Sequence, residues 1–272
     1  MKKTIRLPAP QLSILKEVTI DLDMTGRHYA LLASCEGQTP EDVALSILKD
    51  LVEEDATQLT LPEVRYLFML VKINSLENHY SVNVICNNMV HTKDKDGKEF
   101  EKECDCVNHY DVFLSDADLN PTPPNYEVPI VKFNRDGVEK DYKVLPPAIV
   151  EESKLYNYFL TERGANQEQI MQNKELLYEF SFLRALLHLV DEEGHRFVKP
   201  DDNYNVFIDK SSPKENPNTL YNLNNYQVIT KIFDAVMEVN EYGVQPKIYE
   251  LKCKECGGTV LFQLPLLNGL ID

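Results

Sequence analysis

The chain has 272 residues, of which 43% are hydrophobic, and a formal net charge of −16 at pH 7. A chain of this length and composition can bury a full core, in one large domain or in two smaller ones. The negative charge argues against a protein that binds nucleic acid regardless of sequence, because such binding depends on Lys and Arg that neutralise phosphates. No apolar run is long enough to span a bilayer, and the start MKKTIRLPAPQ lacks the apolar segment of a secretory signal. We therefore expect a cytoplasmic protein whose six cysteines are thiols or metal ligands rather than disulfides.

The first half predicts a strand followed by two helices. KEVTIDLDMT alternates apolar and polar residues, as a half-buried strand does. A helix is expected next, with Thr39 as its N-cap and Pro40 in the first helical position. The sequence TLPE at 60–63 fits a capping box and leads into a second helix, which has apolar residues at i, i+3, i+4 and i+7. This second helix should be largely buried.

The first half then ends in a predicted β-hairpin. HYSVNVIC and CDCVNHYDVFL alternate with period two and flank a charged stretch, which we expect to be a long polar loop. The sequence DKDGKE in this stretch superficially resembles a calcium loop but lacks the further acidic ligands. It is better interpreted as a charged hairpin tip, which could contact a partner. NPTPPN at 120–125 interrupts regular structure and is expected to separate the two halves.

The second half repeats the order of elements in the first. Apolar stripes predict helices around Leu176–Val190 and Ile229–Val236, and YELKCKECGGTVLFQL at 249–264 predicts a terminal hairpin. The expected fold class is α+β, with two pseudo-repeated units that each consist of helices followed by a cysteine-bearing hairpin. The predicted organisation has three parts: an N-terminal unit at 1–119, a Pro-containing connection and strand at 120–149, and a C-terminal unit with a zinc-ribbon-like hairpin at 150–272.

Aligning the two hairpins suggests a shared metal site. Cys86 aligns with Cys253, and when Cys106 is set against Cys256 the apolar residues of the following strands also align. Related units about a pseudo-twofold axis would bring both cysteine pairs together.

The predicted ligands of one closed, structural zinc site are therefore Cys86, Cys106, Cys253 and Cys256. Cys104 is the obvious substitute for Cys106, and His91 or His109 could also replace a thiolate. The alternative is that these cysteines are reduced thiols at turns, because the first hairpin has no Cys-x-x-Cys pair. The remaining cysteine, Cys35, is expected to be a small buried residue without a role.

No motif indicates an enzyme, and we name no catalytic residue. The sequence contains no glycine-rich nucleotide-binding loop, nucleophile elbow or His-Glu-x-x-His zinc motif. The six histidines lack the spacing of a catalytic metal site, and His188 is expected to be a packed helix residue. The acidic runs at 53–55 and 191–193 are expected to be solvated helix ends.

These features, in this order, resemble the baseplate hub subunit or hub assembly proteins of contractile-tailed, T-even-type bacteriophages. The resemblance rests on an acid-rich helix, the segment LPEVRYLFMLVKINSLENHYSVNVIC, the strand YDVFLSDADL, a Pro-containing turn and the Cys-x-x-Cys hairpin. It extends over nearly the whole chain and depends on order and spacing rather than on a catalytic motif.

The resemblance implies a non-enzymatic structural or assembly protein of the tail baseplate hub, located in the virion tail and assembled in the host cytoplasm. Its expected partners are other hub, wedge or tail proteins in a multi-subunit assembly, without direct nucleic-acid contact or a membrane span. The alternative function is a zinc-ribbon adaptor or regulatory nucleic-acid-binding protein, which the cysteine hairpin favours and the charge opposes. A third class, an enzyme with an unrecognised site, would show a deep pocket with coupled acids or histidines.

Overall fold

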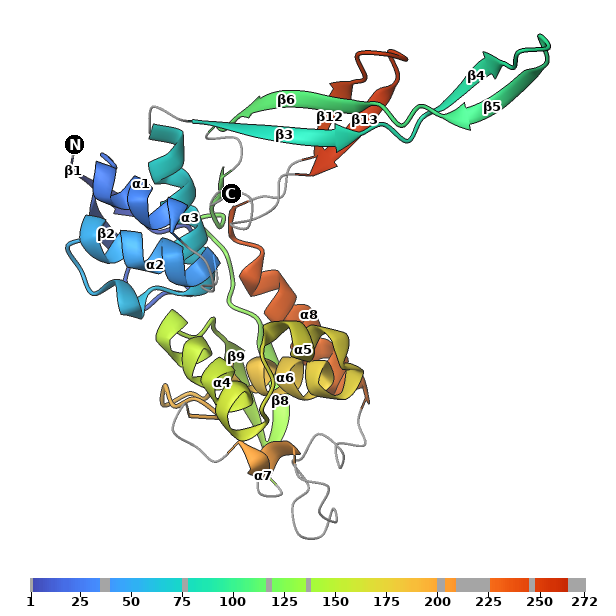
Figure 1. Ribbon diagram of the computed structural model, residues 1–272. Helices are drawn as coiled ribbons and strands as arrows, with labels where there is room; N and C mark the ends of the chain where they lie inside the picture. The colour runs from blue at the N-terminus through green and yellow to red at the C-terminus, as the bar shows by residue number, and fades with distance from the viewer. Residues whose placement is uncertain are drawn as a thin grey trace.

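The computed structural model describes residues 2–34, 40–74, 78–115, 119–135, 138–199, 204–208, 226–244 and 248–263. It combines helices with small antiparallel sheets, so the predicted α+β class is confirmed. The described elements form two helical bodies and a long projecting arm (Figure 1). Among the described residues, no helix is both long and apolar enough to cross a membrane.

The N-terminal body packs three helices against a two-stranded sheet. Its elements are β1 (Lys2–Arg6), β2 (Glu17–Asp21), α1 (Gly26–Ala33), α2 (Pro40–Leu51), the 3-10 helix η1 (Ala56–Gln58) and α3 (Leu61–Asn74). Helix α2 begins at Pro40 as predicted, whereas its expected N-cap, Thr39, lies outside the described residues. The backbone N–H of Thr60 donates to a Glu63 carboxylate oxygen at 2.7 Å, which confirms the acid's half of the predicted capping box. Most of α3 is buried, also as predicted.

The C-terminal body contains a three-stranded sheet covered by helices. Its elements are β8 (Ile130–Arg135), β9 (Val138–Val144), α4 (Ile149–Glu162), α5 (Gln167–Gln172), α6 (Lys174–Leu187), β10 (Leu189–Val190), α7 (Asn205–Ile208) and α8 (Tyr226–Asn240). The sheet has the order β10-β9-β8, and its core side chains include Tyr142, Phe159 and Phe182. Helices α6 and α8 confirm the two stripes predicted for this half.

Two short strands connect the bodies with the arm. β7 (Leu119–Asn120) pairs antiparallel with β11 (Gly243–Val244), which lies just after α8. The backbone of Gly243 lies so close to α3 that an added Cβ would meet the Pro62 carbonyl oxygen at 2.5 Å. Glycine is therefore required at this position, where φ is +119°.

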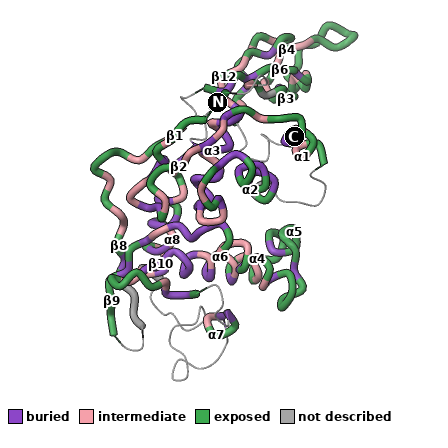
Figure 2. Tube along the Cα trace, turned by 90° about the vertical axis from the view of Figure 1, so that its left-hand side faces the viewer, coloured by how far each residue is buried: buried purple, intermediate pink, exposed green. Residues whose placement is uncertain are grey.

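The arm contains both cysteine-bearing hairpins. Its strands are β3 (His79–Ile85), β4 (Met89–Lys93), β5 (Glu99–Glu103), β6 (Val107–Phe113), β12 (Ile248–Lys252) and β13 (Thr259–Gln263). β3 pairs with β6, β12 with β13, and the β12–β13 hairpin lies beside β3–β6 (Figure 1). Both predicted hairpins are present, but the expected polar loop of the first is largely a second two-stranded ladder, β4–β5, which extends the arm outward. Figure 2 shows this outer part mainly exposed, in contrast to the buried stretches of the helices.

Residues 120–149 and the terminal hairpin do not each pack as one unit with a single half of the chain. β8 and β9 belong to the core of the C-terminal body, and the terminal hairpin packs in the arm. Ile149 and Val244 join the core of the N-terminal body. The boundaries at 119 and 149 and the pseudo-repeat itself stay predictions.

Candidate metal centre

The terminal hairpin presents its two cysteines at a tight turn between β12 and β13. The N–H of Cys253 donates to the Gly258 carbonyl oxygen at 2.9 Å, and the N–H of Gly257 donates to the Cys253 carbonyl oxygen at 3.0 Å. Gly257 has a φ of +68°, in the left-handed region that favours glycine. The CGG sequence therefore folds so that Cys253 and Cys256 lie on one turn, the geometry that a Cys-x-x-Cys metal half-site requires.

The first hairpin presents its cysteines at a β-bulge. The N–H of Cys86 donates to the Cys106 carbonyl oxygen at 2.9 Å, and the N–H of Asp105 donates to the Cys86 carbonyl oxygen at 3.0 Å. Two residues thus lie opposite Cys86, and Asp105 adopts a left-handed φ of 54°. The bulge separates β3–β6 from β4–β5 and sets the direction of Cys104.

The two turns bring four sulfur atoms together. The Sγ atoms of Cys86, Cys104, Cys253 and Cys256 all lie within 4.8 Å of one another. The Cys86–Cys256 sulfurs are 3.6 Å apart and the Cys104–Cys253 sulfurs are 3.8 Å apart. A tetrahedral zinc ion with Zn–S bonds of about 2.3 Å has a sulfur–sulfur edge of about 3.8 Å. The two shortest sulfur–sulfur distances match this edge, and the four thiols lie close enough together to hold one metal ion.

Amide groups surround the sulfur atoms. The Asn88 side-chain amide donates to the Cys86 sulfur at 3.2 Å, and the Asn108 amide donates to the Cys253 sulfur at 3.4 Å. The backbone N–H of Gly258 donates to the Cys256 sulfur at 3.4 Å. Such donors stabilise thiolates and fix their direction, which is the role of outer-shell groups around a metal.

A side chain at Gly258 would collide with the Asn88 amide. An added Cβ would lie 2.5 Å from the Asn88 side-chain nitrogen and 3.3 Å from the Cys256 sulfur. The second glycine of CGG is thus explained by close packing, whereas Gly257 is explained by its φ.

The same amides fasten the two hairpins to each other. Asn108 is buried, and its carbonyl oxygen accepts from the backbone N–H of Lys254 at 2.8 Å. Asn88 also donates to the Thr259 carbonyl oxygen, and the Tyr110 hydroxyl donates to the Lys252 carbonyl oxygen at 2.8 Å. The centre is therefore a junction of two chain segments that lie far apart in the sequence.

The thiols differ in their acidity. Hydrogen bonding from the Cys256 backbone amide is the main cause that lowers the pKa of the Cys253 thiol to about 6. For Cys104, the Cys106 backbone amide acts in the same direction, but burial and the neighbouring thiols outweigh it and raise the pKa to about 12. Four crowded thiolates repel each other unless a cation lies between them, so metal binding would displace the remaining protons.

Cys106 does not belong to this group of four sulfurs, so the prediction that Cys106 is a zinc ligand is corrected. Its sulfur lies 3.8 Å from the Val107 carbonyl oxygen, and the substitute, Cys104, completes the group instead. The physical reason is strand register. Val84 pairs with Asn108, and Leu251 pairs with Val260.

When Val84 is aligned with Leu251, their strand partners Asn108 and Val260 must align as well, and Cys104 then aligns with Cys256. The sequence alignment of Cys106 with Cys256 was therefore two residues out of register. The histidines offered as replacements also lie elsewhere. His91 faces Glu101 on the outer ladder at 3.4 Å, and His109 contacts Asn83 at 3.1 Å.

Sequence reasoning missed the roles of Asn88 and Asn108. Each stands two residues after a cysteine, and this recurring spacing was the available signal. Cys35 lies outside the described residues.

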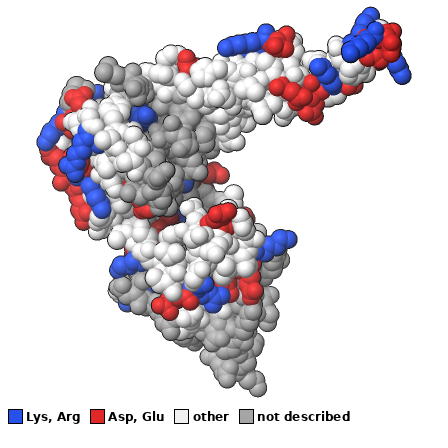
Figure 3. Space-filling view, in the orientation of Figure 1, with Lys and Arg blue, Asp and Glu red and all other residues white. Residues whose placement is uncertain are grey.

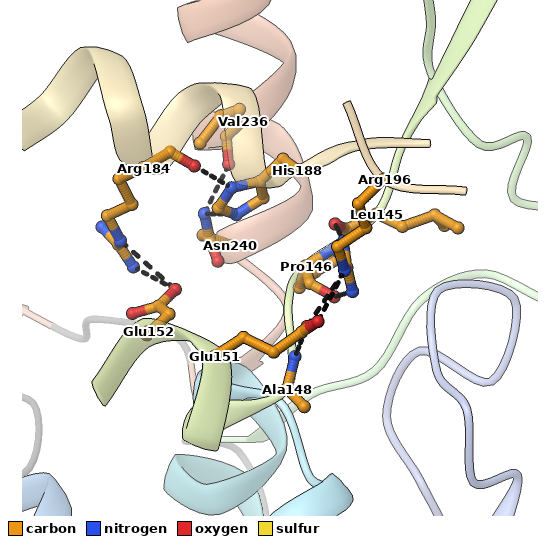
Figure 4. Close-up of polar contacts among 10 residues, drawn as sticks. All are labelled: Leu145, Pro146, Ala148, Glu151, Glu152, Arg184, His188, Arg196, Val236 and Asn240. Atoms are coloured by element: carbon orange, nitrogen blue, oxygen red, sulfur yellow. Dashed lines mark hydrogen bonds and ion pairs between the residues drawn. The ribbon is translucent and has the colours of Figure 1, made fainter. Parts of the chain in front are cut away.

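A second polar cluster lies inside the C-terminal body and is structural in its geometry (Figure 4). His188 is fully buried at the end of α6, with Nδ1 2.8 Å from the Arg184 carbonyl oxygen and Nε2 3.1 Å from the Asn240 amide. Burial lowers the pKa of His188 to about 4, so the ring is neutral at pH 7. Arg184 pairs in turn with Glu152 at 3.0 Å. The prediction that His188 is a packed helix residue is confirmed.

The acidic run at 191–193 is largely exposed, as predicted, but it lies in a turn after β10 rather than at a helix end. Asp191 accepts from the backbone N–H groups of Glu193 and His195. The turn also brings Asp191, Glu193 and His195 within ligand distance of one another, but the group is largely exposed.

Comparison with known proteins adds no relative. No family model, curated protein or solved structure matches the chain at a significant level.

Proposed function

We propose that this protein is a structural or assembly component of a contractile phage tail baseplate, in the hub region, and that it acts through protein–protein contacts. The ordered motifs that resemble the hub family supply the biological setting. The observation that supports a structural role is the four-cysteine junction between two hairpins that are remote in sequence. Catalysis has no part in this proposal.

Zinc in this centre would link the two hairpins partway along the arm, where β3–β6 meets β4–β5. Cys86, Cys104, Cys253 and Cys256 would be its ligands, and four sulfur ligands would leave no open position for a substrate. The ion would supply a rigid crosslink and no reaction. A stiff surface loses less conformational entropy when it docks, which favours ordered assembly.

Co-purification tests this function. Tagged chain recovered from phage-infected cells should bring other hub, wedge or tail proteins with it, and the Cys253→Ser variant should bring less. Recovery of the chain without tail proteins would contradict the proposal. Salt-dependent DNA binding by the purified chain would instead favour the zinc-ribbon adaptor, whose supporting observation is the Cys-x-x-Cys hairpin.

A further inference from the structure

The outer ladder of the arm has a free edge whose chemistry can be derived from its register. β4 and β5 form a sheet of their own in the part of the chain that the structure describes. The N–H of Cys104 donates to the Asn88 carbonyl oxygen at 2.9 Å, and the N–H of Asp94 donates to the Lys98 carbonyl oxygen at 3.0 Å. Asn88 and Cys104, and likewise Asp94 and Lys98, are therefore hydrogen-bonded pairs of the ladder.

Hydrogen-bonded and non-hydrogen-bonded pairs alternate along an antiparallel ladder. Glu99, Glu101 and Glu103 all occupy the non-hydrogen-bonded class, opposite Lys93, His91 and Met89. Their backbone N–H and C=O groups consequently point away from β4. The outer edge of β5 thus presents an N–H and a C=O group at every second residue, and none of these groups has a backbone partner among the described residues.

The carboxylates of the same three residues lie on one face of the ribbon, because alternate residues of a strand share a face. Two of them have cross-strand partners on β4: Glu101 lies 3.4 Å from His91, and Glu99 lies 3.1 Å from Lys93. Glu103 lies opposite Met89 and has no ion pair among the described residues. All of β5 is exposed, and Figure 3 shows charged side chains gathered at this far end of the arm.

The opposite face of β5 is different. It carries Phe100, whose side chain is 45% exposed, together with Lys102. A strand added beside β5 would therefore meet carboxylates on one face and an aromatic ring on the other.

A two-stranded ribbon is marginally stable in water, and a third strand would stabilise it. A second copy of β5 is a poor third strand, because close pairing would place Glu beside Glu. A segment with Lys or Arg at alternate positions would place opposite charges beside the carboxylates, while its backbone satisfies the free edge.

We propose that β5 binds an extended segment of a partner protein by strand addition. The segment carries Lys or Arg at every second residue on the face of Glu99, Glu101 and Glu103, and apolar residues on the face of Phe100. This inference rests on the proposed function in one respect only, that the partner is another protein of an assembly.

The test uses the full zinc-loaded chain and a synthetic peptide in which lysine alternates with threonine and valine. Binding should protect the amide hydrogens of Glu99, Glu101 and Glu103 from exchange, and it should weaken as salt is raised. A peptide with glutamate in place of each lysine is the control and should not bind.

Proline substitutions at the outer edges of β5 and β4 distinguish the contribution of backbone hydrogen bonds to peptide binding from the contribution of charge. Glu101→Pro removes an outward N–H of β5, whereas His91→Pro removes an outward N–H of β4, the opposite edge. The β5 variant should bind the lysine peptide about tenfold more weakly or not at all, and the β4 variant should bind like the parent. Retained protection of the Thr92 and Phe100 amides checks that the ribbon is intact.

If proline unfolds the ribbon, the triple change Glu99→Gln, Glu101→Gln and Glu103→Gln keeps the backbone and should also weaken binding by about tenfold or more. Equal binding to the triple Gln variant, absence of peptide binding to the parent, or protection on the β4 edge would overturn the inference. None of these results bears on co-purification with tail proteins, so failure here is distinguishable from failure of the proposed function.

Discussion

The arm and the C-terminal body hold their shapes by different means. The body buries large side chains almost completely, including Tyr142, Phe159 and Phe182, around one core. Among the described residues, the buried cluster of the arm consists of Cys86, Cys253 and Val260, with a few half-buried neighbours. A body of this kind is stabilised by apolar burial, whereas the arm lacks the apolar area to do the same. Its shape should therefore depend on the cysteine junction, and the two regions should respond to different perturbations.

Loss of a ligand should have the largest effect, and only in the arm. Cys104→Ser should abolish stoichiometric zinc and the amide protection of β12 and β13, because structural zinc contributes about 10 kcal/mol or more to small metal-dependent folds. Hydrogen exchange and metal content measure both effects. Cys106→Ser is the matched control and should keep zinc. If the Cys106 variant loses zinc and the Cys104 variant keeps it, the ligand assignment is reversed.

Truncation of a core side chain in the C-terminal body should destabilise that body and leave the arm unchanged. Phe159→Ala should lower the free energy of unfolding of the C-terminal body by about 3–5 kcal/mol, because it leaves a cavity among Tyr158, Phe180 and their neighbours. Zinc content should not change. Leu160→Ala, at the exposed next position, is the control and should change stability little. Zinc loss in the Phe159 variant would mean that the arm depends on the body.

Acidification should weaken the body through His188. The unfolded chain takes up a proton at its ordinary pKa of about 6.5, while burial keeps the folded side chain unprotonated down to about pH 4. Stability should therefore fall as the pH is lowered through this window, by roughly 2–3 kcal/mol. Urea unfolding at a series of pH values measures the fall, which should be smaller in His188→Gln. A pH dependence as steep in His188→Gln as in the parent would contradict this assignment.

The smallest expected effect concerns the amides around the sulfurs. Gly258→Ala should displace the Asn88 amide from the Cys86 sulfur and lower zinc affinity by about tenfold. Competition with a chromogenic chelator measures this change. Gly97→Ala, at the open tip of the outer ladder, should leave affinity unchanged. Equal affinities in both variants would mean that the amide has no role in metal binding.

Local patterns in the sequence predicted α2, α3, α6, α8 and both cysteine-bearing hairpins, because periodicity and capping act over a few residues. Helix α3 and both hairpins could be recognised from TLPE and from alternating apolar residues. The choice between Cys104 and Cys106 could not, since a bulge with a left-handed Asp105 changes which cysteine faces the junction. The outer ladder was missed because its strands carry charged side chains on one face and contain no buried residue. The alternation of apolar and polar residues that predicts a strand is therefore weak there.

The placement of the terminal hairpin was also beyond local patterns. It packs on β3–β6 through contacts such as Asn108 with Lys254, which join residues far apart in the chain. A repeat suggested that the hairpins meet, but only the strand register shows how they meet.

X-ray absorption at the zinc edge tests the central claim, that the four thiols hold one zinc ion, most directly. For the full chain purified under reducing conditions, we expect one zinc per chain and four sulfur neighbours at about 2.3 Å. Zinc coordinated by nitrogen or oxygen ligands, or a chain that carries no stoichiometric zinc, would contradict the account.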